Sequence, residues 1–329
     1  MAGFPPAIRL NGVVTPLREE PLAGDEIEAA VLPSLHAQAL QSYRTIGSAD
    51  VSLRRAELGR FRVNLHRERG RPAATIRALP VKPPSLADLG FPPQVELLTR
   101  LHHGLVLVGG ATGSGKTTTV AALVNEINRR DAKHIITIED PIEYEHPHQQ
   151  SVVEQVEIGI DAPDFPTALR AALRQAPDVI VIGEMRDPET MKIALTAGET
   201  GHLVFSTLHT TDVTSTVARV ADSFPPERQP TIRQDLSMAL GAVFTQTLIP
   251  RSSGGRVPAA EMLMAGYGAR QHIRKNALQH LHQEITMTKK HGSFTLEESL
   301  AQLVRKGLIT IEDARTRTIH TEELEGLMR

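Results

Sequence analysis

The sequence contains no cysteine and no tryptophan, and these absences exclude several kinds of chemistry. None of its 329 residues is Cys, and Phe, Trp and Tyr together make up 3%. Without cysteine the chain has no disulfide, no thiolate zinc site and no cysteine nucleophile. Because aromatic residues are scarce, Leu, Val, Ile and Ala must fill the core, and few rings can stack on nucleic-acid bases.

A strong net charge and a long apolar run are missing as well. The chain carries 36 Lys and Arg against 38 Asp and Glu, and its formal net charge is −2. This balance gives no general attraction to nucleic acid or to an anionic membrane. No apolar stretch approaches the ~20 residues of a membrane-spanning helix, and the first residues lack the basic and apolar regions of a signal peptide. We therefore expect a cytoplasmic protein, and its length favours two domains.

The most informative motif lies in residues 105–119. Four apolar residues predict a short buried strand, which is followed by a glycine-rich turn and a helix. Gly110, Gly115, Lys116 and Thr117 satisfy the G-x-x-x-x-G-K-[ST] pattern of a phosphate-binding loop. Glycine lets successive backbone N–H groups converge on an anion, and the start of the helix adds its positive dipole end.

We expect this loop to bind a nucleoside triphosphate, ATP, together with Mg²⁺. Lys116 would reach the β- and γ-phosphates, and the Thr117 hydroxyl would ligate the metal ion. Apolar residues recur at helical spacing directly after the loop, as the motif requires: Val120, Leu123, Val124 and Ile127. The residues predicted to bind the nucleotide are Gly110, Thr112, Gly113, Ser114, Gly115, Lys116, Thr117 and Thr118.

Beyond the loop, strands alternate with helices, which predicts an α/β domain with a parallel sheet. Buried strands are expected at 135–138, 179–182 and 203–207, with helices at 165–175 and 188–197. In such sheets the functional residues lie at the carboxyl ends of the strands. The polar residues at those ends are Glu139, Asp140, Glu184 and His209.

These strand ends supply candidate catalytic groups. Glu184 would support the metal together with Thr117, Glu139 would polarise an attacking water, and His209 would sense the γ-phosphate. Glu139 and Glu184 have a plainer interpretation as solvated strand ends, and His209 has one as an ordinary core or surface histidine. His202 and His209 lie at opposite ends of the 203–207 strand, so that they cannot meet the same atom.

Residues 1–80 predict a smaller α+β domain. Two extended apolar runs flank Asn11 and Gly12, which is a strong hairpin signal. Apolar residues at helical spacing predict a helix over 24–43, and alternating residues predict a strand at 60–66 paired with one at 74–79. Prolines then predict a semi-rigid linker. We divide the chain into this domain at 1–80, a linker at 81–93 and a nucleotide-binding domain at 94–329.

The smaller domain is locally basic. Eight arginines face only Glu57 and Glu68 nearby: Arg54, Arg55, Arg60, Arg62, Arg67, Arg69, Arg71 and Arg77. Three interpretations are open, namely a solvated sheet face, a nucleic-acid surface, and arginines that reach the nucleotide of a neighbouring subunit. The nucleic-acid interpretation is the weakest, because only Phe61 offers a ring for stacking.

The last third of the chain predicts further helices around one strand. Apolar spacing predicts a long helix through 232–244 and a strand at 257–264, and Thr295 with Glu298 forms a capping box that opens another helix. Four of the histidines in this part could suggest a metal site, namely His272, His280, His282 and His291. Their spacing matches no standard metal-ligand pattern, so that we interpret them as polar helix faces.

Four stretches together resemble the signature boxes of the secretion ATPase superfamily of type II and type IV secretion. They are residues 109–119, 136–144, 176–187 and 200–211. Within that superfamily the sequence is most similar to the PilT-like branch, the motors of type IV pilus retraction. The resemblance implies a RecA-like P-loop ATPase domain preceded by a PAS-like N-terminal domain.

The resemblance also implies roles for individual residues. Glu139 matches the catalytic glutamate, Glu184 the metal-supporting Walker B residue, and His202 and His209 the histidine box. Arg62 and Arg77 stand where the family has its arginine fingers. The family forms homohexamers that act on pilus machinery through an inner-membrane platform protein, so that contact with the membrane would be only through partners and no nucleic acid is expected.

The helix at 268–274 departs from the retraction branch. It keeps arginines and one isoleucine of the branch's conserved segment but lacks the asparagine. Alternatives to a retraction motor are a pilus or secretion assembly ATPase, an accessory ring subunit with weak hydrolysis, and a nucleic-acid translocase. Lys116, Glu139 and Glu184 argue against the accessory role, and the near-neutral charge argues against the translocase.

Overall fold

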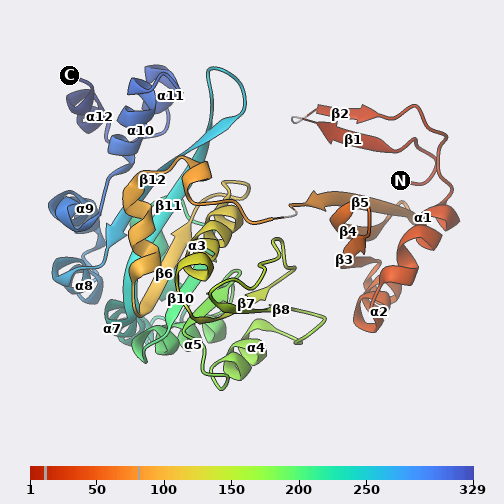
Figure 1. The fold of residues 1–329 in the computed structure, drawn as a ribbon, viewed down its shortest axis with the longest axis horizontal. Helices are drawn as coiled ribbons and strands as arrows, with labels where there is room; N and C mark the ends of the chain where they lie inside the picture. Colours follow the sequence, from red (N-terminus) through yellow and green to blue (C-terminus); the bar gives the residue numbers. More distant parts are fainter. Residues whose placement is uncertain (11–12, 81) are drawn as a thin grey trace. The chain divides into compact units, whose positions relative to one another are not determined.

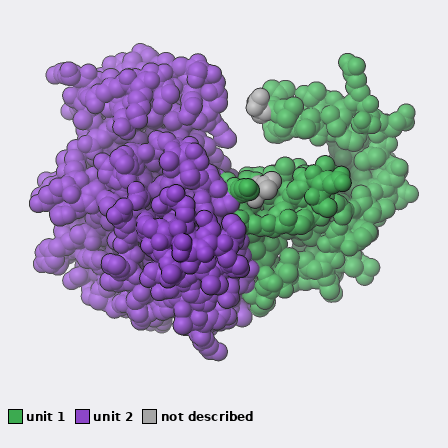
Figure 2. Space-filling model, in the orientation of Figure 1, with its two compact units in different colours: residues 1–82, 140–145, 157–163 green, residues 83–139, 146–156, 164–329 purple. Residues whose placement is uncertain are grey.

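The computed structural model describes residues 1–10, 13–80 and 82–329, and the chain forms two compact units (Figures 1 and 2). Unit 1 comprises Met1–Lys82, Asp140–Glu145 and Glu157–Pro163; unit 2 comprises Pro83–Glu139, His146–Val156 and Asp164–Arg329. The predicted turn at Asn11 and Gly12 lies outside the described residues. Among the residues described, no helix combines the length and apolar character needed to cross a bilayer.

Unit 1 is built on an antiparallel sheet in the order β3-β4-β5. Its elements are β1 (Ala7–Leu10), β2 (Val13–Pro16), α1 (Gly24–Val31), η1 (Leu32–Ser34), α2 (Ala37–Ile46), β3 (Ser48–Arg55), β4 (Gly59–Glu68) and β5 (Arg71–Leu79). The predicted strand pair is confirmed, because β4 and β5 are antiparallel with Val63 opposite Ile76. Buried Val63 and Leu65 of the sheet pack with Ile27 and Tyr43 of the helices.

The prediction of one helix over 24–43 is wrong, because the structure has two helices there. Pro33 has no N–H to donate to the preceding turn, so that regular α-helical hydrogen bonding cannot continue through it. Leu32 is still helical, and the chain becomes extended at Leu35 (φ −77°, ψ 129°). The chain ends α1 at Val31 and passes through the short turn η1. The ring of His36 then caps α2 by accepting a hydrogen bond from the N–H of Ala39 at 3.3 Å.

Two segments from the middle of the chain belong to unit 1, and Arg60 holds one of them. Arg60 is 9% exposed; its Nη2 donates to the carbonyl of Ile142 at 2.8 Å, and its Nε lies 3.1 Å from Oε1 of Glu145. Arg54 also pairs with Glu145 but is far more exposed. The guanidinium of Arg60 therefore fixes the segment that directly follows Glu139 in the sequence.

Unit 2 contains a seven-stranded sheet in the order β12-β11-β6-β10-β9-β7-β8. The strands are β6 (Gly104–Gly109), β7 (His134–Glu139), β8 (Val152–Glu157), β9 (Val179–Ile182), β10 (Leu203–Leu208), β11 (Leu240–Pro250) and β12 (Arg256–Met264). The five from β11 to β7 are parallel, and β12 runs antiparallel to β11. The predicted parallel sheet is thus confirmed, and strands β6, β9 and β10 are buried along their whole length.

Helices cover both faces of this sheet (Figure 1). Helix α3 (Lys116–Arg130) leads from β6 to β7 in one direction across the sheet, whereas α5 (Pro188–Glu199) leads from β9 to β10 in the other. Right-handed crossovers therefore place these two helices on opposite faces. Three further helices lie on the same face as α5, namely α4 (Phe165–Ala172), α6 (Val213–Asp222) and α7 (Gln229–Ala239).

The long helix predicted through 232–244 is also wrong. Helix α7 ends at Ala239, and residues 240–250 form strand β11. The apolar pattern suits either structure, but Gly241 weakens a helix, and the strand gains a parallel pairing with β6 in which Thr245 lies opposite Gly109. Tertiary pairing thus overrides the helical spacing.

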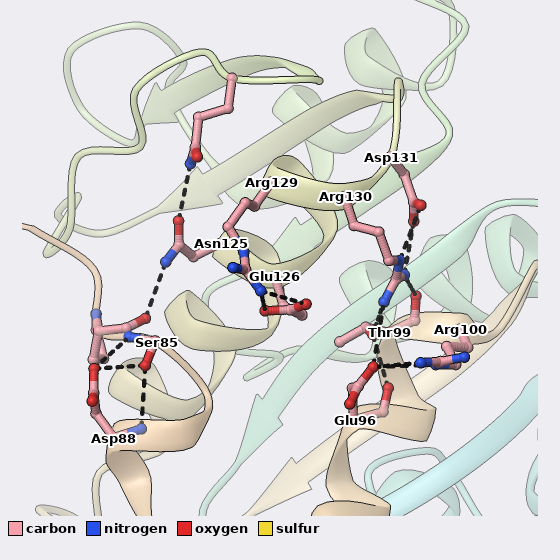
Figure 3. Close-up of polar contacts among 12 residues, drawn as sticks. Ser85, Asp88, Glu96, Thr99, Arg100, Asn125, Glu126, Arg129, Arg130 and Asp131 are labelled. Atoms are coloured by element: carbon pink, nitrogen blue, oxygen red, sulfur yellow. Dashed lines mark hydrogen bonds and ion pairs between the residues drawn. The ribbon is translucent and has the colours of Figure 1, made fainter.

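Residues 84–100, which follow the junction between the units, lie beside α3 (Figure 3), and the ring of Phe91 packs edge-on against Phe244 of the sheet with centroids 5.1 Å apart. They include the short helices η2 (Ala87–Leu89) and η3 (Pro93–Arg100). Arg130 donates to the side chain and carbonyl of Thr99 at 2.9 and 2.8 Å, and Asn125 donates to the carbonyl of Pro84 at 3.2 Å. The helix that begins at the phosphate-binding loop and the sheet beside it therefore hold this segment together.

A small helical layer completes unit 2. Its elements are α8 (Tyr267–Arg274), η4 (Leu278–His280), α9 (Leu281–Met287), η5 (Lys289–His291), α10 (Leu296–Arg305), α11 (Ile311–Arg315) and α12 (Thr321–Met328). The predicted capping box is confirmed, with the Thr295 hydroxyl accepting from the N–H of Glu298 at 3.3 Å. Leu300, Ala314 and Leu324 form part of its core against Ile249 and Val257 of the sheet.

Candidate functional site

The loop between β6 and α3 closes tightly on itself. A Cβ at Gly110 would lie 2.3 Å from Oγ of Ser114 and 2.7 Å from the carbonyl oxygen of Gln246. Gly115, the N-cap of α3, has a φ of +92°, a backbone conformation that residues other than glycine rarely adopt. These two positions explain why the motif requires glycine, and the loop leads directly into a helix start that favours anions.

Lys116 lies inside the loop. It is 7% exposed, and its Nζ donates to the carbonyls of Gly110 at 2.7 Å and Ala111 at 3.1 Å. Burial lowers the pKa of Lys116 below its usual value, and the carboxylate of Glu184 acts in the opposite direction. Oγ of Ser114 is buried without a hydrogen-bond partner. A loop with an ammonium and an orphaned hydroxyl fits a bound phosphate group.

His209 connects the loop to the end of β9. Its Nδ1 lies 3.3 Å from Nζ of Lys116 and 3.3 Å from Oγ1 of Thr112. Its Nε2 lies 3.6 Å from Oε2 of Glu184, which also pairs with Arg186. The carboxyl ends of β6, β9 and β10 thus bring a lysine, a carboxylate and an imidazole together.

Glu139 ends β7, the next strand along this edge. Its Oε1 accepts from Oγ1 of Thr137 at 2.7 Å and from Nε2 of Gln155 at 3.2 Å. The N–H of Gly183 bonds to the carbonyl of Ile138 at 2.8 Å, so that Glu139 and Glu184 follow paired strands. These two donors fix the orientation of the Glu139 carboxylate at the end of β7.

Thr117 and Thr118 occupy the first turn of α3, beside Lys116. The structure does not bring His202 to this edge, since His202 precedes β10 whereas His209 follows it, and Nδ1 of His202 contacts the carbonyl of Ala197 at 3.2 Å. Arg62 and Arg77 lie in unit 1.

Arg62 and Arg77 face each other across β4 and β5. Nε of Arg62 lies 3.2 Å from Oδ1 of Asp50, and the Arg77 side chain is exposed. Two arginines of neighbouring strands therefore share this part of the sheet of unit 1 with one carboxylate.

Gln246 is a structural part of the site that the sequence did not reveal. It is 5% exposed; its Nε2 donates to the carbonyl of Ser114 at 2.6 Å, and its Oε1 accepts from Oγ1 of Thr119 at 2.6 Å. One side chain of β11 therefore holds both the loop and the first turns of α3. No local signal could have found it, because its partners lie more than a hundred residues earlier in the sequence.

Glu261 of β12 supports the segment that carries His209. Its Oε1 accepts from the N–H of Val213, the first residue of α6, at 2.6 Å and from Oγ1 of Thr245 at 3.1 Å. Burial raises the pKa of Glu261 to about 7. Only residues 210–212 lie between His209 and α6. The contact between Glu261 and the start of α6 therefore fixes the C-terminal end of the loop that carries His209.

Comparison with known proteins identifies the family. The family described as Type II/IV secretion system protein matches residues 60–317. The chain is 40% identical over 314 residues to the Type IV pilus retractation ATPase PilT of Pseudomonas aeruginosa, covering 95% of this chain and 91% of that protein. It is 40% identical over 320 residues to the Twitching motility protein of Neisseria gonorrhoeae, covering 97% and 86%.

Solved structures agree with these sequence relatives. A crystal structure of the pilus retraction motor PilT with bound ADP matches with a TM-score of 0.89 and 42% identity, covering 99% of this chain and 94% of that one. The resemblance in the four sequence boxes and the predicted fold class are therefore confirmed. This chain belongs to the Type II/IV secretion system protein family and, within it, to the PilT-like secretion ATPases.

Proposed function

We propose that this chain is an ATP-hydrolysing motor that drives type IV pilus retraction, and with it twitching motility. The observation that carries the ATPase site is the cluster of Lys116, His209 and Glu184 at one edge of the sheet, with contacts of 3.3 and 3.6 Å. The link to retraction is supported by the names of the relatives that match nearly the whole chain.

The chemistry follows from the geometry of these residues. The loop N–H groups and Lys116 would bind the phosphates of ATP, and Lys116 would exchange its two carbonyl partners for phosphate oxygens. Mg²⁺, held by Thr117 and Glu184, would neutralise charge on those oxygens. Glu139 would orient a water and accept its proton as the water attacks the γ-phosphorus and the bond to the β-phosphate oxygen breaks. His209 would report whether the γ-phosphate is present.

The working form in this proposal is a homohexamer at the cytoplasmic face of the inner membrane, acting through a membrane platform protein of the pilus machinery. Arg62 and Arg77 would act as arginine fingers toward the nucleotide of a neighbouring subunit. Their position opposite each other on β4 and β5 supports this role, because residues paired in this way extend from the same face of the sheet and guanidinium groups bind phosphate oxygens well. Such fingers are worth roughly 10³–10⁵ in rate in related phosphoryl transfers.

Glu139→Gln tests the chemistry. The amide keeps the shape of the side chain but cannot accept a proton, so that we expect kcat to fall by about 10²–10⁴ while the affinity for ADP stays unchanged. Glu199→Gln, at the exposed end of α5, is the matched control. Phosphate release and binding of a fluorescent ADP analogue measure the two effects. Unchanged turnover in Glu139→Gln would contradict the assignment.

A strain that lacks the gene tests the cellular role. Abundant surface pili with lost surface motility support retraction. Cells without pili would instead make the chain an assembly motor, and no change would favour an accessory ring subunit. Stimulation of the ATPase by DNA would contradict the expected absence of nucleic-acid partners.

A further inference from the structure

Three side chains of the C-terminal helices meet in a cluster that shares no residue with the nucleotide site. They are His282 of α9, Glu297 of α10 and Glu323 of α12, and each offers one potential ligand atom within 4.8 Å of the other two. Nε2 of His282 lies 2.9 Å from Oε2 of Glu323. Three separate helices therefore place one nitrogen and two carboxylates around one point.

A threonine hydroxyl orients each carboxylate. Oγ1 of Thr318 accepts from the N–H of His320 at 2.8 Å, and it donates to Oε1 of Glu297. Oγ1 of Thr295 accepts from the N–H of Glu298 at 3.3 Å and donates to Oε1 of Glu323 at 3.0 Å. Hydrogen bonds of this kind typically hold the carboxylates that ligate metal ions.

The second oxygen of Glu297 provides an independent observation. Glu297 is 2% exposed, yet its Oε2 is buried and has no hydrogen-bond partner. Buried polar atoms are nearly always paired, so that an orphan requires an explanation. The Oε2 atom of Glu297 is therefore an acceptor that a bound cation would satisfy.

We propose that His282, Glu297 and Glu323 bind a divalent metal ion of the Zn²⁺ class. Nitrogen and carboxylate oxygens are ligands that zinc accepts, at about 2.0–2.2 Å in tetrahedral geometry, which places ligand atoms roughly 3.3–3.6 Å apart. Nε2 of His282 and Oε2 of Glu323 are 2.9 Å apart, and the three potential ligand atoms all lie within 4.8 Å of one another. Only small shifts of the side chains would therefore bring them to the tetrahedral spacing. The three protein ligands leave one position for water.

The surroundings of the cluster support this assignment. A pocket lined by His282, His320 and Glu323 opens beside the cluster and gives an ion a path of entry. The ring of His320 stacks on that of His282 with centroids 3.9 Å apart, which fixes the orientation of the ligand. Bound metal would tie α12 to α9 and α10 and so hold the C-terminal tail on the sheet. This proposal is independent of the direction in which the motor works.

Zn²⁺ titrated into the nucleotide-free full-length chain, after treatment with EDTA, tests the site. We expect equilibrium dialysis to find one Zn²⁺ per chain that His282→Gln no longer binds. At a free Zn²⁺ concentration 100 times the Kd, the unfolding equilibrium constant should fall by about 100-fold in the wild type and stay unchanged in the variant. Co²⁺ gives a second readout, because tetrahedral coordination produces visible absorption bands.

His272→Gln is the matched control. His272 also faces a carboxylate, with Nε2 3.3 Å from Oε1 of Glu284, but this pair is not part of the three-ligand cluster. The control should therefore keep the bound Zn²⁺. Glu297→Gln should lose it, and if that variant does not fold, Glu323→Gln replaces it. Equal Zn²⁺ binding by the wild type and His282→Gln would overturn the proposal, and so would no binding by the wild type.

Discussion

Replacement of Gln246 by leucine should loosen the phosphate-binding loop from the sheet. Gln246 makes two hydrogen bonds of 2.6 Å, one with the carbonyl of Ser114 and one with the hydroxyl of Thr119. Leucine keeps much of the volume but removes both bonds. Thr119 is 1% exposed, so that its hydroxyl cannot turn to solvent instead.

The magnitude follows from the two groups left without partners. A buried polar group that loses its partner costs about 1–3 kcal/mol. With both groups affected, and with some relaxation of the loop, we expect Gln246→Leu to lower the free energy of unfolding by about 2–4 kcal/mol. In a domain of 150–250 residues each kcal/mol shifts the Tm by about 2–4 °C, which predicts a loss of at least about 4 °C.

A double-mutant cycle isolates the bond between Gln246 and Thr119. Thr119→Val alone leaves Oε1 of Gln246 without its donor, whereas the double variant removes both partners of that bond. The double variant should therefore lose about 1–2 kcal/mol less than the sum of the single variants. Thermal unfolding and binding of a fluorescent ADP analogue are the assays, and Gln246→Leu should also weaken nucleotide binding. A change below about 0.5 kcal/mol, or strict additivity, would refute the reasoning.

Three further predictions concern other parts of the chain. In the folded state the pKa of Glu261 is raised from 4.5 to about 7, so that the free energy of unfolding of the wild type should fall by about 3 kcal/mol as the pH rises from 4.5 to 8. Glu261→Gln has no carboxyl group to titrate at this position and should not show this fall, which a plot of Tm against pH measures. Gly110→Ala should abolish ADP binding because its Cβ meets backbone at 2.7 Å, whereas Gly113→Ala, with φ +78 and open space, should cost only about 1–2 kcal/mol. Arg60→Ala should cost about 2–4 kcal/mol and expose residues 140–145 to proteolysis, whereas Arg54→Ala, which loses an exposed pair with the same Glu145, should cost less than about 1 kcal/mol.

Local patterns predicted much of the fold and most of the candidate site. The strand at 179–182 and the loop ending at Lys116 were predictable because buried parallel strands are continuous apolar runs and because phosphate binding requires glycines at set positions. Polar residues at strand ends led to Glu139, Glu184 and His209. The comparisons confirm the family, whereas the catalytic roles of these residues remain predictions.

The errors came from segments in which two structures fit the same pattern. Residues 240–244 continue the helical spacing of α7, but pairing with β6 makes them a strand. The interpretation of the histidines in the last third as polar helix faces is not one of these errors and stays a prediction. The structure adds that His282 lies near Glu297 and Glu323 of two other helices.

The phosphate-binding loop, the parallel sheet and the order of the polar strand ends could be predicted from local patterns, because turn chemistry and hydrophobic periodicity act between near neighbours in the chain. Four other features became visible only in the folded chain: β11 is a strand, Gln246 holds the loop, Arg60 holds residues 140–145, and three helices bring His282, Glu297 and Glu323 together. Each of these depends on side chains far apart in sequence, whose meeting is set by the packing of whole elements and leaves no local pattern.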